Sequence, residues 1–154
     1  MNTIKSVLIA NRGEIAIRIS KTLNEMGIEA YGVYSKDDRS GTHLSYCSKV
    51  FELSGIGPSA YLNMDEILSI TKNNKIGAIH PGYGFLSENQ SFAAACLENQ
   101  IVFIGPNEKI LKTFGDKEKA KKLAQKLNLP TCLSVGPIEK KSDILNFFKK
   151  IKKN

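Results

Sequence analysis

Short apolar runs alternate with amphipathic segments along most of the chain. Compact apolar runs predict five strands, at residues 6–10, 30–34, 49–53, 77–80 and 101–104. Apolar residues at helical spacing predict helices over residues 15–26, where Gly27 is a suitable C-terminal cap, and over residues 64–71. Strands that are apolar on both faces and alternate with helices form parallel sheets covered on both sides. We therefore predict an α/β fold with a Rossmann-like parallel sheet and helices on both faces.

The second part of the chain carries further helix signals. Ser87 and Gln90 have the spacing of a capping box and predict a helix through about residue 98. Asp116 is a suitable N-cap for a lysine-rich helix over residues 117–127, and a link with proline and glycine follows at residues 129–137. A last amphipathic helix presents an apolar face made of Ile144, Leu145, Phe147, Phe148 and Ile151. Such a face packs on the first domain or on a part of the protein that this chain lacks.

Composition and charge narrow the classes of function. The chain has 154 residues, 42% hydrophobic and 24% charged, which fits about one globular domain. Its net charge of +7 first suggests a nucleic-acid or acidic membrane partner. However, residues 117–154 hold 11 lysines against three acidic residues, a net of +8, whereas residues 1–116 have a net charge of −1. The excess belongs to the last quarter alone, so we expect neither a nucleic-acid partner nor a membrane partner.

Targeting signals and metal-ligand patterns are also missing from the sequence. No apolar run approaches the ~20 residues that span a bilayer, and no signal-peptide pattern opens the chain, so we do not expect secretion. The three cysteines, Cys47, Cys96 and Cys132, are far apart and form no CxxC. They predict reduced thiols in a cytoplasm rather than a disulfide framework or a zinc site. His43 and His80 do not stand at metal-ligand spacing from them, so no metal site is expected.

In a parallel sheet the ligand binds where strands exit into loops, here residues 11–14, 80–87 and 105–107. Two glycine patterns, at residues 55–60 and 82–87, imitate a dinucleotide fingerprint. A genuine fingerprint sits at the first strand–helix turn, which has only one glycine here, so both patterns predict ordinary turns. The chain has no GxxxxGK phosphate loop.

Two of these exits carry candidate chemistry beside an ordinary structural interpretation. Residues 11–14 either form a turn that places Glu14 at a helix N-terminus or present an arginine and backbone amides to a ligand. Residues 80–89 (HPGYGFLSEN) contain a proline and two glycines that fix an unusual backbone path. They form either a packed turn or a binding loop in which His80, Tyr83 and Glu88 act.

Lys117 is a third candidate. A lysine in the first turn of a helix is disfavoured by the helix dipole, which suggests an anionic partner. The alternative is a solvated lysine in a lysine-rich helix.

Four segments share their order and spacing with one family. They are residues 9–16 (IANRGEIA), 80–89 (HPGYGFLSEN), 103–106 (FIGP) and 115–117 (GDK). From about residue 4 to residue 130 the chain resembles the N-terminal part of biotin carboxylase, the ATP-dependent component of acetyl-CoA carboxylase and related biotin-dependent carboxylases.

The resemblance implies a fold and a reaction. Residues 1–115 would form the Rossmann-like pre-ATP-grasp domain, and residues 116–154 would begin an ATP-grasp domain. In the family, ATP phosphorylates bicarbonate to carboxyphosphate, and the carboxyl group passes to biotin on a biotin carboxyl carrier protein or domain. The implied partners are this carrier, a carboxyltransferase component and a second copy in a homodimer. In acetyl-CoA carboxylase the reaction serves fatty-acid synthesis.

The resemblance also implies roles for individual residues. Lys117 matches a lysine that contacts the ATP phosphates. Tyr83 matches a tyrosine on the biotin side of the active site, and His80, Gly84 and Glu88 belong to the same loop. The dimer contact would use Arg18, Lys21 and Glu25, with Lys21 standing where an arginine is common.

The chain departs from the family mainly in what it does not contain. Missing are the glycine-rich phosphate loop, the second ATP-binding lysine, the acidic Mg²⁺ ligands and the catalytic arginine and glutamate. Phosphoryl transfer depends on such groups, so we expect no catalytic residue in this chain and no turnover by it alone. The favoured interpretation is an N-terminal biotin carboxylase fragment. The alternatives are a non-catalytic regulatory or assembly module derived from the same domain, and a nucleic-acid binder that rests only on the lysine-rich end.

Overall fold

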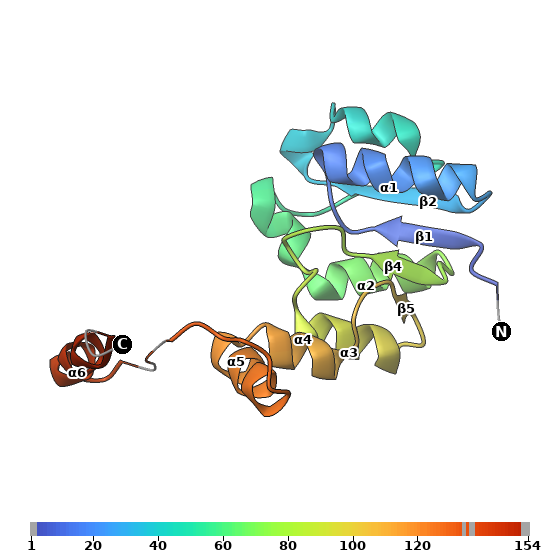
Figure 1. Ribbon diagram of the computed structural model, residues 1–154. Helices are drawn as coiled ribbons and strands as arrows, with labels where there is room; N and C mark the ends of the chain where they lie inside the picture. The colour runs from blue at the N-terminus through green and yellow to red at the C-terminus, as the bar shows by residue number, and fades with distance from the viewer. Residues whose placement is uncertain (1–2, 134, 136–137, 152–154) are drawn as a thin grey trace. The chain divides into compact units, whose positions relative to one another are not determined.

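A five-stranded parallel sheet forms the centre of the first part of the chain. The computed structural model describes residues 3–133, 135 and 138–151. The strands are β1 (Ser6–Ile9), β2 (Glu29–Tyr34), β3 (Lys49–Glu52), β4 (Ala78–His80) and β5 (Val102–Phe103). They are all parallel in the order β3-β2-β1-β4-β5, so that β1 lies between β2 and β4 (Figure 1). Leu8 is in register with Tyr31 of β2 and Ile79 of β4, which confirms the predicted parallel sheet.

Helices cover both faces of this sheet, because alternate residues of a strand point to opposite sides. The three helices are α1 (Gly13–Glu25), α2 (Met64–Asn73) and α3 (Gln90–Glu98). On one face, Leu8 of β1 belongs to a buried cluster with Ile67 of α2 and Phe92 of α3. On the other face, Val7 clusters with Leu23 of α1. The predicted helices on both faces are therefore confirmed.

Three sequence predictions about these elements are wrong in detail. Asn89, not Ser87, caps α3, because its side-chain oxygen accepts a hydrogen bond from the Phe92 amide at 3.0 Å. The Ser87 amide instead donates to the Gly84 carbonyl at 2.8 Å and closes a turn. Strand β5 has two residues and is shorter than predicted. Strand β3 is not buried on both faces, because it lies at the edge of the sheet.

Short helical segments that the apolar pattern did not predict fill the connections. They are the 3₁₀ helices η1 (Lys36–Asp38), η2 (Thr42–Tyr46) and η3 (Gly57–Leu62), and the α-helix α4 (Glu108–Phe114). Such short elements carry too few residues for a periodic signal. The glycine pattern at residues 82–87 forms a turn, as predicted, whereas most of the pattern at residues 55–60 belongs to η3. Gly57, Gly82 and Gly84 have positive φ.

The chain divides into two compact units, Met1–Leu111 and Lys112–Asn154. The second unit contains α5 (Lys117–Lys126) and α6 (Lys141–Ile151). Asp116 caps α5 as predicted, because its carboxylate accepts from the Glu118 and Lys119 amides at 3.0 and 3.1 Å. The apolar face predicted for α6 is largely open, with Leu145 and Phe148 more than half exposed. Part of the predicted link at residues 129–137 lies outside the described residues.

Candidate functional site

The strand order creates a switch point beside β1. The chain runs from β1 to β2 and β3 on one side, and then returns to place β4 and β5 on the other. In open parallel sheets, ligands bind at the carboxyl ends of the strands at such a point. Two segments leave the sheet there: the turn after β1, which begins with Asn11, and residues 80–89 after β4, here named the switch-point loop. The Ala10 amide donates to the His80 carbonyl at 2.9 Å and joins the two exits.

Asn11 connects this turn to the switch-point loop. Its side chain is 2% exposed. The amide nitrogen Nδ2 donates to the carbonyls of Pro81 and Tyr83, both at 2.9 Å. The side-chain oxygen Oδ1 accepts from the Arg12 amide at 2.9 Å. One buried side chain therefore fixes the loop to the start of α1.

His80 is half-buried at the end of β4 and bonds within the loop. Its Nδ1 lies 3.0 Å from the Gly82 amide nitrogen, which donates to it. Since Nδ1 accepts, the ring proton of the neutral imidazole is on Nε2. Burial lowers the pKa of His80 below its ordinary value. His80 is therefore neutral near pH 7 and stabilises the turn.

The other predicted residues of the switch-point loop face solvent. Tyr83 is 79% exposed, although its backbone carbonyl is held by Asn11. Gly84 has a φ of +69° and is exposed, as is Glu88. The loop therefore combines a fixed backbone with a free aromatic side chain at its tip.

A cluster whose members the sequence analysis did not connect to one another lies beside the loop. Tyr61 is fully buried in η3, and its hydroxyl donates to Asp38 Oδ2 at 3.0 Å and accepts from the Ser35 amide at 3.3 Å. Burial raises the pKa of Tyr61 to about 12. The ring of Tyr61 stacks on Phe85 of the switch-point loop, with the centroids 5.1 Å apart.

Arg12 completes this cluster. Its Nη1 lies 3.7 Å from Asp38 Oδ2, and its guanidinium carbon lies 5.8 Å from the centre of the Tyr61 ring. The structure places Glu14 in the first turn of α1, as in the first interpretation of residues 11–14. Arg12, which the second interpretation assigns to a ligand, contacts two protein groups, Asp38 and Tyr61. Tyr61 is in no amphipathic repeat, so only the fold connects it to Asp38 and the loop.

The three residues expected at a dimer contact lie on α1 and are exposed. The Arg18 guanidinium bonds to the Thr22 hydroxyl one turn later. The Lys21 ammonium lies 5.3 Å from the centre of the Tyr46 ring. Glu25 is the last residue of the helix. Their role in a dimer stays a prediction.

Lys117 is the first residue of α5 and is exposed. It belongs to the second unit, whereas the switch-point loop belongs to the first. The contact of Lys117 with ATP stays a prediction. In the part of the chain that the structure describes, no three His, Cys, Asp or Glu side chains are grouped to hold a metal ion. No helix there is long and apolar enough to cross a membrane.

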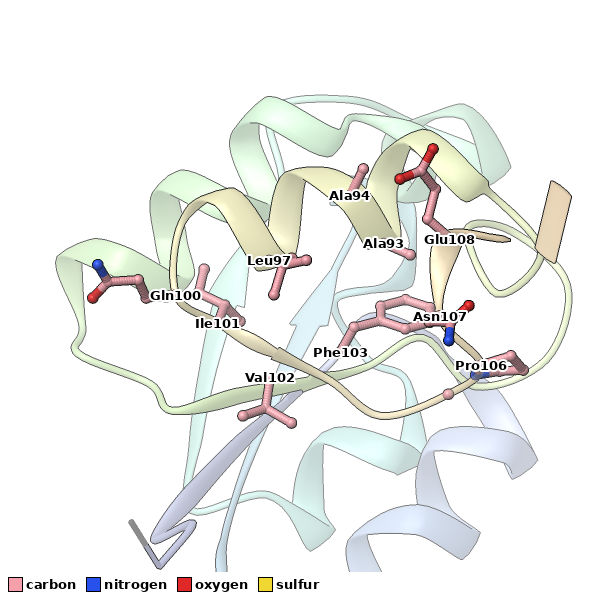
Figure 2. A pocket seen from close by; sticks show the side chains of 11 residues that line it. Ala93, Ala94, Leu97, Gln100, Ile101, Val102, Phe103, Pro106, Asn107 and Glu108 are labelled. Carbon is pink, nitrogen blue, oxygen red and sulfur yellow. The ribbon is translucent and has the colours of Figure 1, made fainter. Parts of the chain in front are cut away.

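Two apolar hollows lie in the first unit. One, of about 410 Å³, lies between α3 and β5, where Ala93 and Leu97 lie on one side and the Phe103 ring on the other (Figure 2). None of the predicted site residues lines it. The second, of about 510 Å³, runs along α1. Its lining is mainly apolar but also includes Arg18 and His80. Tyr83 lines neither hollow.

The fold and its loops thus define a Rossmann-like domain whose switch-point loop has a backbone held by hydrogen bonds. Comparison with known proteins identifies the family. Residues 3–111 match the family model described as biotin carboxylase, N-terminal domain. The chain is 50% identical over 141 residues to a pyruvate carboxylase of Bacillus subtilis, covering 89% of this chain and 12% of that protein. It is 41% identical over 130 residues to the alpha subunit of mouse mitochondrial methylcrotonoyl-CoA carboxylase, covering 83% of this chain and 18% of that subunit.

Solved structures agree with this match. The biotin carboxylase domain of the 2-oxoglutarate carboxylase of Hydrogenobacter thermophilus, a dimer in complex with MgADP, ADP and bicarbonate, superposes with a TM-score of 0.93. It is 34% identical, and the alignment covers 98% of this chain and 34% of that one. The chain belongs to the biotin carboxylase N-terminal domain family. It spans 12% of the pyruvate carboxylase and about a third of the solved biotin carboxylase domain.

Proposed function

We propose that this chain is the N-terminal part of a biotin carboxylase, which uses ATP and bicarbonate to carboxylate biotin on a carrier protein or domain. The observation that carries the proposal is the switch-point loop. Its backbone is held by Asn11 and His80, and its tip presents the exposed Tyr83 at the ligand end of the sheet. The relative solved with MgADP and bicarbonate has the same fold over nearly the whole chain and supports this reaction.

Each unit has its own proposed part in the reaction. In the first unit, Tyr83 lines the biotin side, with His80, Gly84 and Glu88 in the same loop. A neutral His80 suits this place, because it holds the turn without adding a charge beside an uncharged ring. In the second unit, taken as the start of an ATP-grasp domain, Lys117 contacts the phosphates of ATP.

The remaining chemistry needs groups outside this chain. A transferring phosphoryl group requires metal ions and several cations around it. The described residues offer no clustered metal ligands, so the Mg²⁺ ion that accompanies ATP would be held by other parts of the carboxylase. We therefore expect the isolated chain to show no biotin-dependent ATP hydrolysis. A homodimer through Arg18, Lys21 and Glu25, a carrier and a carboxyltransferase component complete the proposed assembly.

The acceptor of the carboxyl group is set by the carboxyltransferase component. The relatives include pyruvate and methylcrotonoyl-CoA carboxylases, so one N-terminal domain serves different acceptors. An acetyl-CoA carboxylase with a role in fatty-acid synthesis remains part of the proposal without support of its own from these relatives.

The free state of Cys47, Cys96 and Cys132 supports the proposed cytoplasmic location.

A chimera tests the proposed function directly. This chain replaces the matching N-terminal region of the Bacillus subtilis pyruvate carboxylase, to which it is 50% identical over 141 residues. We expect biotin-dependent ATP hydrolysis within about tenfold of the parent enzyme, a difference of about 1.4 kcal/mol in barrier height. A folded chimera that hydrolyses no ATP would instead support the non-catalytic regulatory or assembly module.

Lys117→Gln in the same chimera tests the proposed ATP contact. The substitution keeps a polar side chain, one atom shorter, and removes its charge. We expect kcat/KM for ATP to decrease by at least tenfold, because a phosphate contact is lost. Lys121→Gln, one turn further along α5, is the matched control and should leave kcat/KM for ATP within about twofold. Equal effects of the two substitutions would show that Lys117 has no special part in binding ATP.

A further inference from the structure

Among the residues that the structure describes, Asn11 is the buried polar side chain that joins the two exits of the switch point. Both N–H groups of Nδ2 donate to the switch-point loop, and Oδ1 accepts from the Arg12 amide in its own turn. The two accepting carbonyls belong to Pro81 and Tyr83, on either side of Gly82. Both donations therefore act on a single tight turn.

The turn is shaped to fit the Asn11 side chain. Gly82 has a φ of +69°, and a Cβ atom there would lie 2.4 Å from Asn11 Nδ2. No side chain can be accommodated at this distance, so glycine at 82 permits the close approach of Asn11. The approach in turn places the Gly82 amide on His80 Nδ1, at 3.0 Å.

The other end of the loop is fixed separately. Phe85 stacks on the buried Tyr61, and Leu86 is 1% exposed in the core. Between the two anchors, Tyr83 and Gly84 stand out into solvent. The direction of Tyr83 is therefore set by the turn that Asn11 holds rather than by contacts of its own ring.

We propose that Asn11 is a positioning residue for the switch-point loop: its side-chain amide fixes the Pro81–Tyr83 turn so that Tyr83 projects in one direction. That the direction serves biotin rests on the proposed function. Asn11 touches the loop and not the ligand, and it acts through the backbone of Tyr83. The hydrogen bonds that hold the turn all come from this chain's own residues.

Asparagine-to-aspartate substitutions at two positions separate donation from acceptance. Asn11→Asp keeps the acceptor of the Arg12 amide but replaces both donations by an oxygen that repels the Pro81 and Tyr83 carbonyls. Asn89→Asp is the matched control at the far end of the loop. There the side chain only accepts, from the Phe92 amide, so aspartate preserves the bond. Asn11→Ala is a second, uncharged variant that removes the same donations.

Nuclear magnetic resonance of the full chain gives the readout, because the sequence has only two histidines. In the unsubstituted chain we expect His80 to hold its proton on Nε2 and the Gly82 amide to be protected from exchange. In Asn11→Asp and Asn11→Ala we expect a mixture of His80 tautomers and at least a tenfold loss of Gly82 protection. The signals of His43, which is buried elsewhere in the core, should not change. Asn89→Asp should behave like the unsubstituted chain.

Two results would overturn the proposal. One is an unchanged Gly82 amide and His80 tautomer in a folded Asn11 variant. The other needs no substitution: side-chain Nδ2 protons of Asn11 that exchange with water at the rate of a free amide. Neither result depends on biotin, so the proposal can fail while the chimera is active, and it can hold while the chimera is inactive.

Discussion

Tyr61→Phe tests whether the buried cluster beside the switch-point loop stabilises the first unit. The substitution keeps the ring and its stacking on Phe85, and it removes only the hydroxyl. Two hydrogen bonds are lost, a donation to Asp38 at 3.0 Å and an acceptance from the Ser35 amide at 3.3 Å. A bond to a charged group contributes about 1.5–3 kcal/mol, and a buried donor left unpaired costs about 1–3 kcal/mol.

The net effect should be smaller than the sum of these terms. The new phenylalanine no longer buries a hydroxyl, and the Asp38 side chain is 21% exposed, so water replaces part of the lost bond. We therefore expect the free energy of unfolding to decrease by about 2 kcal/mol. Urea titration, followed by the amide signals of β1, measures this value for the first unit itself.

Tyr31→Phe is the matched control. The Tyr31 hydroxyl also donates to a carboxylate, Glu29 Oε2, at 2.8 Å, but this pair is exposed to solvent. We expect a change within about 0.5 kcal/mol, as is usual for surface substitutions. Equal effects of the two substitutions would refute the reasoning, since burial would then not determine the contribution of the hydroxyl.

The remaining predictions concern the turn, the histidine and the helix cap. Gly82→Ala should destabilise the fold by at least about 1 kcal/mol more than Gly84→Ala, because both have a φ of +69° but only Gly82 would clash with Asn11; urea titration compares them. Burial lowers the pKa of His80, so the unfolded chain binds a proton at higher pH than the folded chain does. The free energy of unfolding should therefore decrease as pH falls below about 6.5, and less so in His80→Gln; identical pH dependence of the two chains would contradict this. Asp116→Ala should reduce exchange protection of the α5 amides severalfold, whereas Asp116→Asn, which keeps an acceptor at the cap, should preserve it.

The sheet and its main helices could be predicted from the sequence because their signals are local. An apolar run such as residues 6–10 or a cap such as Asp116 has the same meaning wherever it lies in space. The positive φ of Gly27, just after α1, follows from the same kind of local signal. The parallel direction of the strands also follows, since strands that alternate with helices along the chain pair in parallel.

The capping residue of α3 could not be predicted with the same certainty. Ser87 and Asn89 are both good N-caps by residue type. The turn closed by the Ser87 amide on the Gly84 carbonyl decides between them, and this turn depends on the path of the whole loop. The short strand β5 and the exposed strand β3 likewise reflect their places in the sheet and not their composition.

The candidate site divides in the same way. The switch-point loop could be predicted because its proline, glycines, histidine and tyrosine lie within ten consecutive residues (80–89). The residues that hold the loop could not be predicted, because they are distant from it in the sequence. Asn11 lies 72 positions before its partner Tyr83, and Tyr61 lies 24 positions before its partner Phe85. The sequence does not show that the Asn11 amide and the Tyr61 hydroxyl are buried beside the loop, because their burial depends on the whole fold.

The Michaelis constant for biotin of the Tyr83→Ala chimera tests the central claim most directly. If the switch-point loop is the biotin side of the active site, removing the exposed ring should raise KM for biotin about tenfold, a loss of about 1.4 kcal/mol of binding, and leave KM for ATP within about twofold. Tyr46→Ala, which alters another ring of the same unit outside the loop, should change neither constant. A Tyr83→Ala chimera with the parent KM for biotin would contradict the account.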